Sequence, residues 1–140
     1  MHTDLVIMLV DNDETDNLIT SKLIEHSKLC HQIVQFTSGR MALQFLETNV
    51  GNPDKLPDLI FLDLNMPVMN GSAFLQELEA LGNRLTKNPK VVVLSSADLS
   101  QNSSNYIDSK RVIKFLTKPL NPMALSEILK KNTVDSLKVA

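Results

Sequence analysis

The sequence predicts an α/β fold: a doubly wound sheet of five parallel strands with helices on both faces. Two observations predict it. Short apolar runs alternate five times with stretches of about 10–15 residues at helical spacing. The hydrophobic content of 43% in 140 residues suits one packed core. Because crossovers between parallel strands are right-handed, we expect a ligand crevice at the carboxyl ends of the strands.

The first apolar run, residues 5–10, is uninterrupted, which is typical of a strand buried on both faces. Residues 14–28 carry apolar side chains at helical spacing, with acids at the start and Lys28 at the end, as the helix dipole favours. A second strand is predicted at residues 31–36. The next helix runs to about residue 47, and Ser38 is its expected N-cap.

Residues 48–57 contain Asn, Gly and two prolines, and they predict a loop. The third strand is expected at residues 59–62. A turn-rich connection at residues 65–71 then leads to a helix over about residues 72–81.

The fourth strand is predicted at residues 90–94. The Ser- and Asn-rich stretch 98–108 is the weakest helix candidate in the chain. A fifth strand follows at residues 112–116. Asn121-Pro122 starts the last helix, with Asn as the cap and Pro in the first turn, and the sequence leaves its end beyond residue 133 open.

Four polar side chains close the apolar runs: Asp11, Asp63, Ser95 and Lys118. If the runs are parallel strands, these side chains emerge at one edge of the sheet and converge on one cleft. Carboxylates, a hydroxyl and an ammonium together suit a metal-assisted phosphoryl site with an aspartate nucleophile. Ser96 competes with Ser95, because strand alternation turns only one of the two into the cleft.

Asp63 is the predicted nucleophile, since an ionised carboxylate on a sharp loop can attack phosphorus. Asp11 and the residues after it would supply oxygen ligands for Mg²⁺, and the backbone carbonyl of Asn65 would complete the set. We expect Asp13 to cap the first helix as well. Lys118, restricted to an extended backbone by the proline after it, is expected to pair with Asp63.

Composition excludes several other classes of function. The net charge of −2 and the lack of a Lys/Arg block argue against direct nucleic-acid binding. No apolar stretch approaches the roughly 20 residues of a membrane span, and no secretory signal is seen. The single cysteine, Cys30, fits a reducing compartment, so we expect a cytoplasmic protein. No phosphate-binding glycine motif supports nucleotide hydrolysis.

Four separated motifs together resemble the receiver domain of two-component response regulators. They are Leu9-Val10-Asp11-Asn12-Asp13, Asp58 to Pro67 with Gly71, Leu94-Ser95-Ser96-Ala97 and Phe115-Leu116-Thr117-Lys118-Pro119. The resemblance spans essentially residues 1–140, so it implies a single receiver domain without an output domain. It also implies the flavodoxin-like, CheY-like strand order 2-1-3-4-5.

The resemblance further implies that Asp63 takes a phosphoryl group from a phosphohistidine on a sensor histidine kinase or a histidine phosphotransfer protein. Mg²⁺ or Mn²⁺ would be held by Asp11, Asn12, Asp63 and the Asn65 carbonyl. Catalysis would be limited to the domain's own phosphorylation and dephosphorylation.

Lys118 and Ser95 would grip the phosphoryl group. The resemblance implies that the Ser95 hydroxyl then moves inward and that Phe115 rotates into the vacated space. The face formed by the fourth helix, the fifth strand and the last helix would change its preference for a downstream protein target. In physical terms this is a two-state element biased by a new charge.

One departure from the family is Asn12, which stands where a second acid is usual. Either Asp13 swings in as a ligand, or the site works with one carboxylate less. Two rival functions stay open. One is a receiver-like interaction module whose phosphorylation has lapsed. The other is a haloacid-dehalogenase-type phosphohydrolase, because residues 11–15 fit D-x-D-x-T with Asp11 as the nucleophile and Asp13 as the general acid.

Overall fold

The computed structural model describes residues 5–64, 66, 68–95 and 110–139. The described elements are, in order, β1 (Leu5–Val10), α1 (Glu14–Ser27), β2 (Cys30–Phe36), α2 (Gly39–Thr48), β3 (Leu59–Asp63), α3 (Gly71–Leu81), the 3-10 helix η1 (Gly82–Arg84), β4 (Lys90–Ser95), β5 (Val112–Thr117) and α4 (Pro122–Val139). The helix predicted at residues 98–108 lies outside the described residues.

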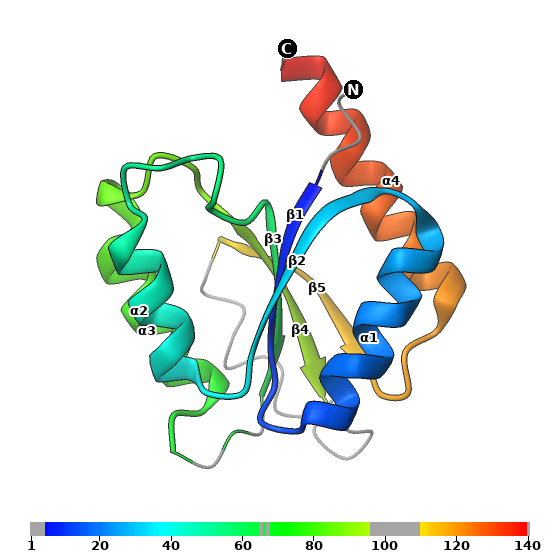
Figure 1. Cartoon of the computed structure of the whole chain (residues 1–140), viewed down its shortest axis with the longest axis horizontal. Helices are drawn as coiled ribbons and strands as arrows, with labels where there is room; N and C mark the ends of the chain where they lie inside the picture. The colour runs from blue at the N-terminus through cyan, green and yellow to red at the C-terminus, as the bar shows by residue number, and fades with distance from the viewer. Residues whose placement is uncertain (1–4, 65, 67, 96–109, 140) are drawn as a thin grey trace.

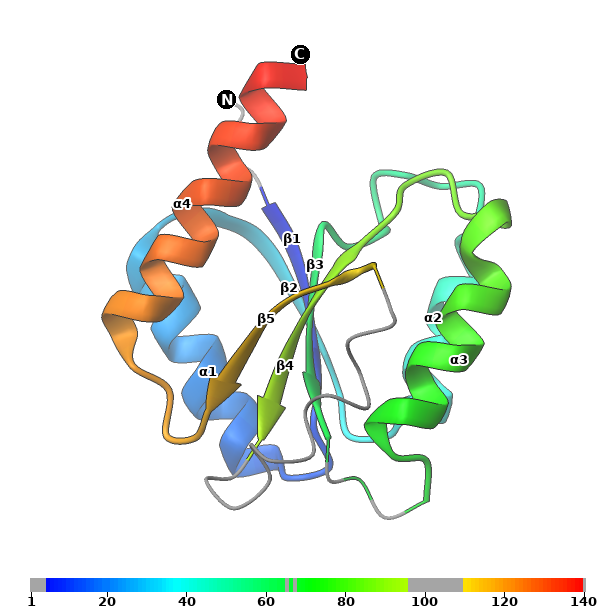
Figure 2. The same cartoon turned by 180° about the vertical axis from the view of Figure 1, so that it is seen from behind.

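The five strands form one parallel sheet in the order β2-β1-β3-β4-β5. Helices α1 and α4 cover one face, and α2 and α3 cover the other (Figures 1 and 2). The predicted fold class and strand order are therefore confirmed. The chain runs outward from β1 to β2 and returns to β3 on the other side of β1. This reversal places the expected ligand crevice between the ends of β1 and β3.

Alternation along the strands divides the core between the two faces. In β1, Met8 and Val10 belong to the buried cluster under α2 and α3, whereas Ile7 and Leu9 belong to the cluster under α1 and α4. Every residue of β1 and β3 is buried. Helices on both sides thus explain why these runs are uninterruptedly apolar.

The predicted caps are present. The Asp13 carboxylate accepts two backbone N–H groups at the start of α1, Ser38 accepts one at the start of α2, and Asn121 accepts two at the start of α4. Lys28 caps α1 with a left-handed backbone instead of being its last helical residue. Helix α4 continues to Val139, which answers the question that the sequence left open.

Four strands are one residue longer than predicted. β2 begins at Cys30, and at the carboxyl edge β3 includes Asp63, β4 includes Ser95 and β5 includes Thr117. The last three are longer because the ladder of backbone hydrogen bonds continues to the carboxyl edge of the sheet, where the N–H of Lys118 donates to the Ser95 carbonyl at 2.8 Å. Among the described residues, no helix is both long and apolar enough to cross a membrane.

Candidate phosphoryl-transfer site

The side chains at the carboxyl edge of the sheet meet at the Lys118 ammonium. Its Nζ lies 2.7 Å from Oδ2 of Asp11, 2.9 Å from Oδ2 of Asp16 and 3.7 Å from Oδ2 of Asp63. The side chains of Asp11 and Asp63 are only 4% and 7% exposed. The structure therefore gathers three of the predicted site residues, which are remote in the sequence, around one buried point.

Asp16 is a participant that the sequence reasoning missed. The sequence identifies it only as one of the acids at the start of the first helix, but its carboxylate accepts a hydrogen bond from Lys118. The expected pairing of Lys118 with Asp63 is the longest of the three contacts. A signal was available in the sequence: Asp13 caps α1, so a residue three positions later lies in the first turn, beside the strand ends.

The charges around Lys118 determine its protonation state. Burial alone would lower the pKa of this ammonium, but hydrogen bonds to Asp11 and Asp16 and the charge of Asp63 outweigh burial and raise the pKa to about 12. Lys118 is therefore a permanent cation at physiological pH.

Asp11 is fixed from behind. The Asn17 side-chain amide donates to the backbone carbonyls of Asp11 and Phe36, at 3.0 and 3.2 Å, and so joins the ends of β1 and β2. The backbone N–H of Asp13 donates to Oδ1 of Asp11 at 3.0 Å, which leaves Oδ2 for Lys118. Because Asn17 is buried, its hydrogen bond to the Asp11 carbonyl is protected from water.

The remaining predicted site residues are distributed as follows. Ser95 is buried at the end of β4, next to the strand that leads to Lys118. Phe115 is partly buried in β5 and packs on the cluster under α2 and α3. Asn12 is exposed just after β1. Asn65 and Ser96 lie outside the described residues.

The carboxylates at the sheet edge can be compared with the ligands that Mg²⁺ requires. The described residues contain no group of three or more His, Cys, Asp or Glu side chains that could hold a metal. Mg²⁺ usually needs only one or two carboxylates and completes its octahedron with water and phosphate oxygens. The two buried carboxylates of Asp11 and Asp63 fit that requirement.

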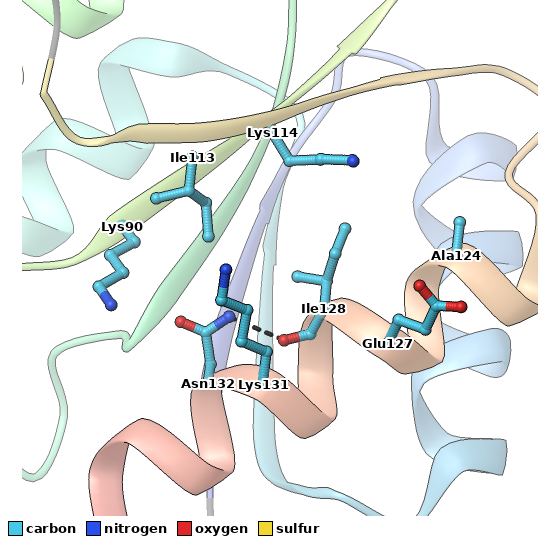
Figure 3. Close-up of a pocket in the computed structure, with 8 residues that line it drawn as sticks. All are labelled: Lys90, Ile113, Lys114, Ala124, Glu127, Ile128, Lys131 and Asn132. Atoms are coloured by element: carbon cyan, nitrogen blue, oxygen red, sulfur yellow. Dashed lines mark hydrogen bonds between the residues drawn. The ribbon is translucent and has the colours of Figure 1, made fainter. Parts of the chain in front are cut away.

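A second feature is a pocket of about 430 Å³ between β5, the start of β4 and α4 (Figure 3). Its lining residues are Lys90, Ile113, Lys114, Ala124, Glu127, Ile128, Lys131 and Asn132. The lining contains three lysines and one glutamate, so its net charge is positive. The two isoleucines supply apolar surface. The Asn132 side chain donates to the Ile128 carbonyl at 2.7 Å and is thereby fixed against its own helix.

Comparison with known proteins places this geometry in a family. Residues 7–130 match the model of the response regulator receiver domain. Response regulator Rcp1 of Synechocystis sp. (strain ATCC 27184 / PCC 6803 / Kazusa) is 31% identical over 119 residues, which are 83% of this chain and 78% of Rcp1.

Two longer or more distant proteins are also similar. Sensor histidine kinase CheAY of Helicobacter pylori is 25% identical over 93% of this chain, which spans only 15% of the kinase's length. The crystal structure of the receiver domain of sensor histidine kinase PA1611 from Pseudomonas aeruginosa PAO1, with a magnesium ion coordinated in its active-site cleft, has a TM-score of 0.73. The two proteins share 18% identity over 93% of this chain and 98% of that one, so this likeness concerns the fold alone.

Proposed function

This chain belongs to the response regulator receiver domains of two-component systems, and on that premise we propose that Asp63 is its phosphoacceptor. In the reaction, a carboxylate oxygen of Asp63 forms a bond to phosphorus while the bond from phosphorus to a histidine nitrogen of the donor breaks. The nitrogen leaves with the electron pair and becomes protonated. The donor is a sensor histidine kinase or a histidine phosphotransfer protein.

The observation that carries this proposal is the meeting of Asp63 with Asp11 and Lys118. A buried carboxylate that receives a phosphoryl group gains negative charge where water is scarce, so a cation within reach is required. Lys118 supplies it, since its Nζ lies 3.7 Å from Oδ2 of Asp63 and its raised pKa keeps it charged. Ser95, at the end of β4, is assigned as a hydroxyl donor to another phosphoryl oxygen.

Asp11 and Asp63 would hold Mg²⁺, with Asn12 and the Asn65 carbonyl as further ligands. The ion, when bound, neutralises charge on the incoming phosphoryl group and helps to align it. Asn12 offers an amide oxygen in place of a carboxylate, so the site has one negative charge fewer than the family pattern. We therefore expect a weaker affinity for Mg²⁺ than in a receiver with two acids at these positions.

The phosphoacceptor assignment is tested by incubating the protein with Mg²⁺ and acetyl phosphate and measuring its intact mass. We expect the wild type to gain one phosphoryl group, and Asp63→Asn or a chelator to prevent the gain. The matched control is Asp54→Asn, which removes an exposed acid from the loop before β3 and should leave the gain unchanged. An adduct that persists in Asp63→Asn would refute the assignment.

The downstream partner is proposed to dock on the basic pocket between β5 and α4 (Figure 3). The excess of lysines over glutamate fits an acidic segment, and Ile113 and Ile128 offer apolar contacts to it. Phe115, one residue after Lys114 in the same strand, would transmit the state of the site to this surface. Transfer of a phosphoryl group from a histidine kinase, as proposed above, agrees with a cytoplasmic location.

Charge reversal tests the docking surface. Lys131 lines the pocket, whereas Lys130 is its exposed neighbour in α4 and does not. A partner captured by the protein carrying a phosphoryl mimic should be lost from Lys131→Glu and retained by Lys130→Glu. Equal retention or equal loss in the two variants would contradict this placement, because both carry the same net charge.

A further inference from the structure

The contacts of Lys118 are unevenly divided among the three carboxylates around it. Its ammonium has three hydrogens. Two of them reach Asp11 and Asp16 at hydrogen-bonding distance, whereas Oδ2 of Asp63 at 3.7 Å lies beyond that distance. The cation therefore rests on the α1 side of the cleft, displaced from the proposed acceptor oxygen.

Asp16 holds this position because its own backbone is fixed. The Asp16 N–H donates to Oδ1 of Asp13, the N-cap of α1, at 3.1 Å. Its side chain is 38% exposed, in contrast to the buried Asp11 and Asp63. Solvent screens a partly exposed ion pair, so the bond between Asp16 and Lys118 costs less to break than a buried one would.

We propose that Asp16 is a positioning residue that competes with the phosphoryl group for Lys118, and so sets how readily the phosphorylated state forms. This inference rests on the proposed function. In the resting protein, Asp16 draws the ammonium away from Asp63. When Asp63 carries a phosphoryl group, the new oxygens compete for the same N–H donors, and the contact with Asp16 is given up.

Asp11 is less suited to this role. It is a proposed metal ligand and is held by the backbone N–H of Asp13, so its position is already determined. Asp16 contacts the proposed machinery only through Lys118 among the interactions described above. Its removal should therefore change the cation's position without removing a proposed ligand.

The experiment compares the wild type with Asp16→Asn in affinity for the beryllium trifluoride anion, a phosphoryl mimic, at saturating Mg²⁺. Freeing Lys118 from a partly exposed ion pair should tighten binding of the mimic by roughly two- to fivefold. The affinity for Mg²⁺ alone should not rise, because a lost carboxylate cannot favour a cation. Asp16→Ser serves as a second variant and should show the same direction.

Glu14→Gln is the matched control. Glu14 is an exposed acid in the same first turn of α1, and it is not among the carboxylates paired with Lys118. An equal gain in affinity for the mimic in Glu14→Gln would overturn the inference, because removal of any nearby negative charge would then explain the gain. Equal or weaker binding of the mimic by Asp16→Asn would also overturn it, with the phosphoacceptor assignment intact. Failure of the wild type to bind the mimic would overturn both.

Discussion

Strands β1 and β5 both end at the site, yet they occupy different environments. All six residues of β1 are buried, and β2 and β3 flank it. β5 is an edge strand, and Ile113 in it is 41% exposed. Asp11 thus follows an interior strand of the sheet, whereas Lys118 follows an edge strand that also lines the basic pocket.

This difference in burial means that the two sides of the site are held with different firmness. The acceptor side of the site, formed by β1 and β3, is held by two layers of packing. The cation side is held by fewer buried contacts, and elements with few buried contacts open at a lower cost. If Asp63 is phosphorylated as proposed, the change would therefore reach the surface most readily through Lys118 and β5.

The largest expected effect compares one truncation in the two strands. Ile7→Ala in β1 should lower the free energy of unfolding by about 2–5 kcal/mol, because Ile7 is fully buried. Ile113→Ala in β5 should cost less than about 1 kcal/mol, because much of the side chain is already exposed. Urea denaturation of both variants checks this, and equal losses would remove the contrast between the strands.

The next effect concerns the connection after β3. A Cβ added at Gly71 would lie 3.1 Å from the Leu64 backbone Cα, so Gly71→Ala should destabilise the protein by about 1–3 kcal/mol. Gly51 has nothing within 4 Å of the same added atom. Gly51→Ala should be neutral or slightly stabilising. Thermal unfolding distinguishes the two variants. An unchanged melting temperature for Gly71→Ala would show that the backbone at Leu64 can move away from the added Cβ.

Much of this architecture could be predicted from the sequence. The uninterrupted run before Asp11 and the capping residues Asp13 and Ser38 predicted local elements that the structure contains, because burial and capping act over short distances. The convergence of Asp11, Asp63 and Lys118 followed from the parallel sheet.

Side-chain choices among neighbouring acids could not be predicted in the same way. Which carboxylate Lys118 contacts depends on differences of about 1 Å at the end of a strand, and the pattern of residues does not encode them. The cap at Asp13 places Asp16 near the strand ends, but it does not show that Lys118 lies closer to Asp16 than to Asp63. The pocket beside β5 was likewise invisible, because Lys90, Lys114 and Lys131 come from three different elements.

A smaller effect is expected at the cap of α1. Asp13→Ala removes the acceptor for the backbone N–H groups of Thr15 and Asp16 and should cost about 1 kcal/mol of stability. Chemical denaturation measures the loss. Asp13→Asn, which keeps a capping oxygen, should recover most of it. If it does not, the charge of Asp13 is more important than its hydrogen bonds.

The smallest effect appears only at high pH. Because the pKa of Lys118 is raised from 10.5 to about 12, the folded protein binds this proton more tightly than the unfolded chain does. The resulting stabilisation is fully present below about pH 10.5 and is lost as the pH rises through 12. An NMR titration of the Lys118 side chain should find a lower midpoint in Asp16→Asn. An unchanged midpoint would mean that Asp16 contributes little to the field at Lys118.

The role of Asp63 as the acceptor is tested most directly by locating the phosphoryl group. Borohydride reduction of the phosphorylated protein converts an aspartyl phosphate into homoserine, which peptide mass spectrometry assigns to one position. We predict homoserine at residue 63 alone. Homoserine at residue 11 would contradict it and would favour the phosphohydrolase chemistry that the D-x-D-x-T pattern first raised.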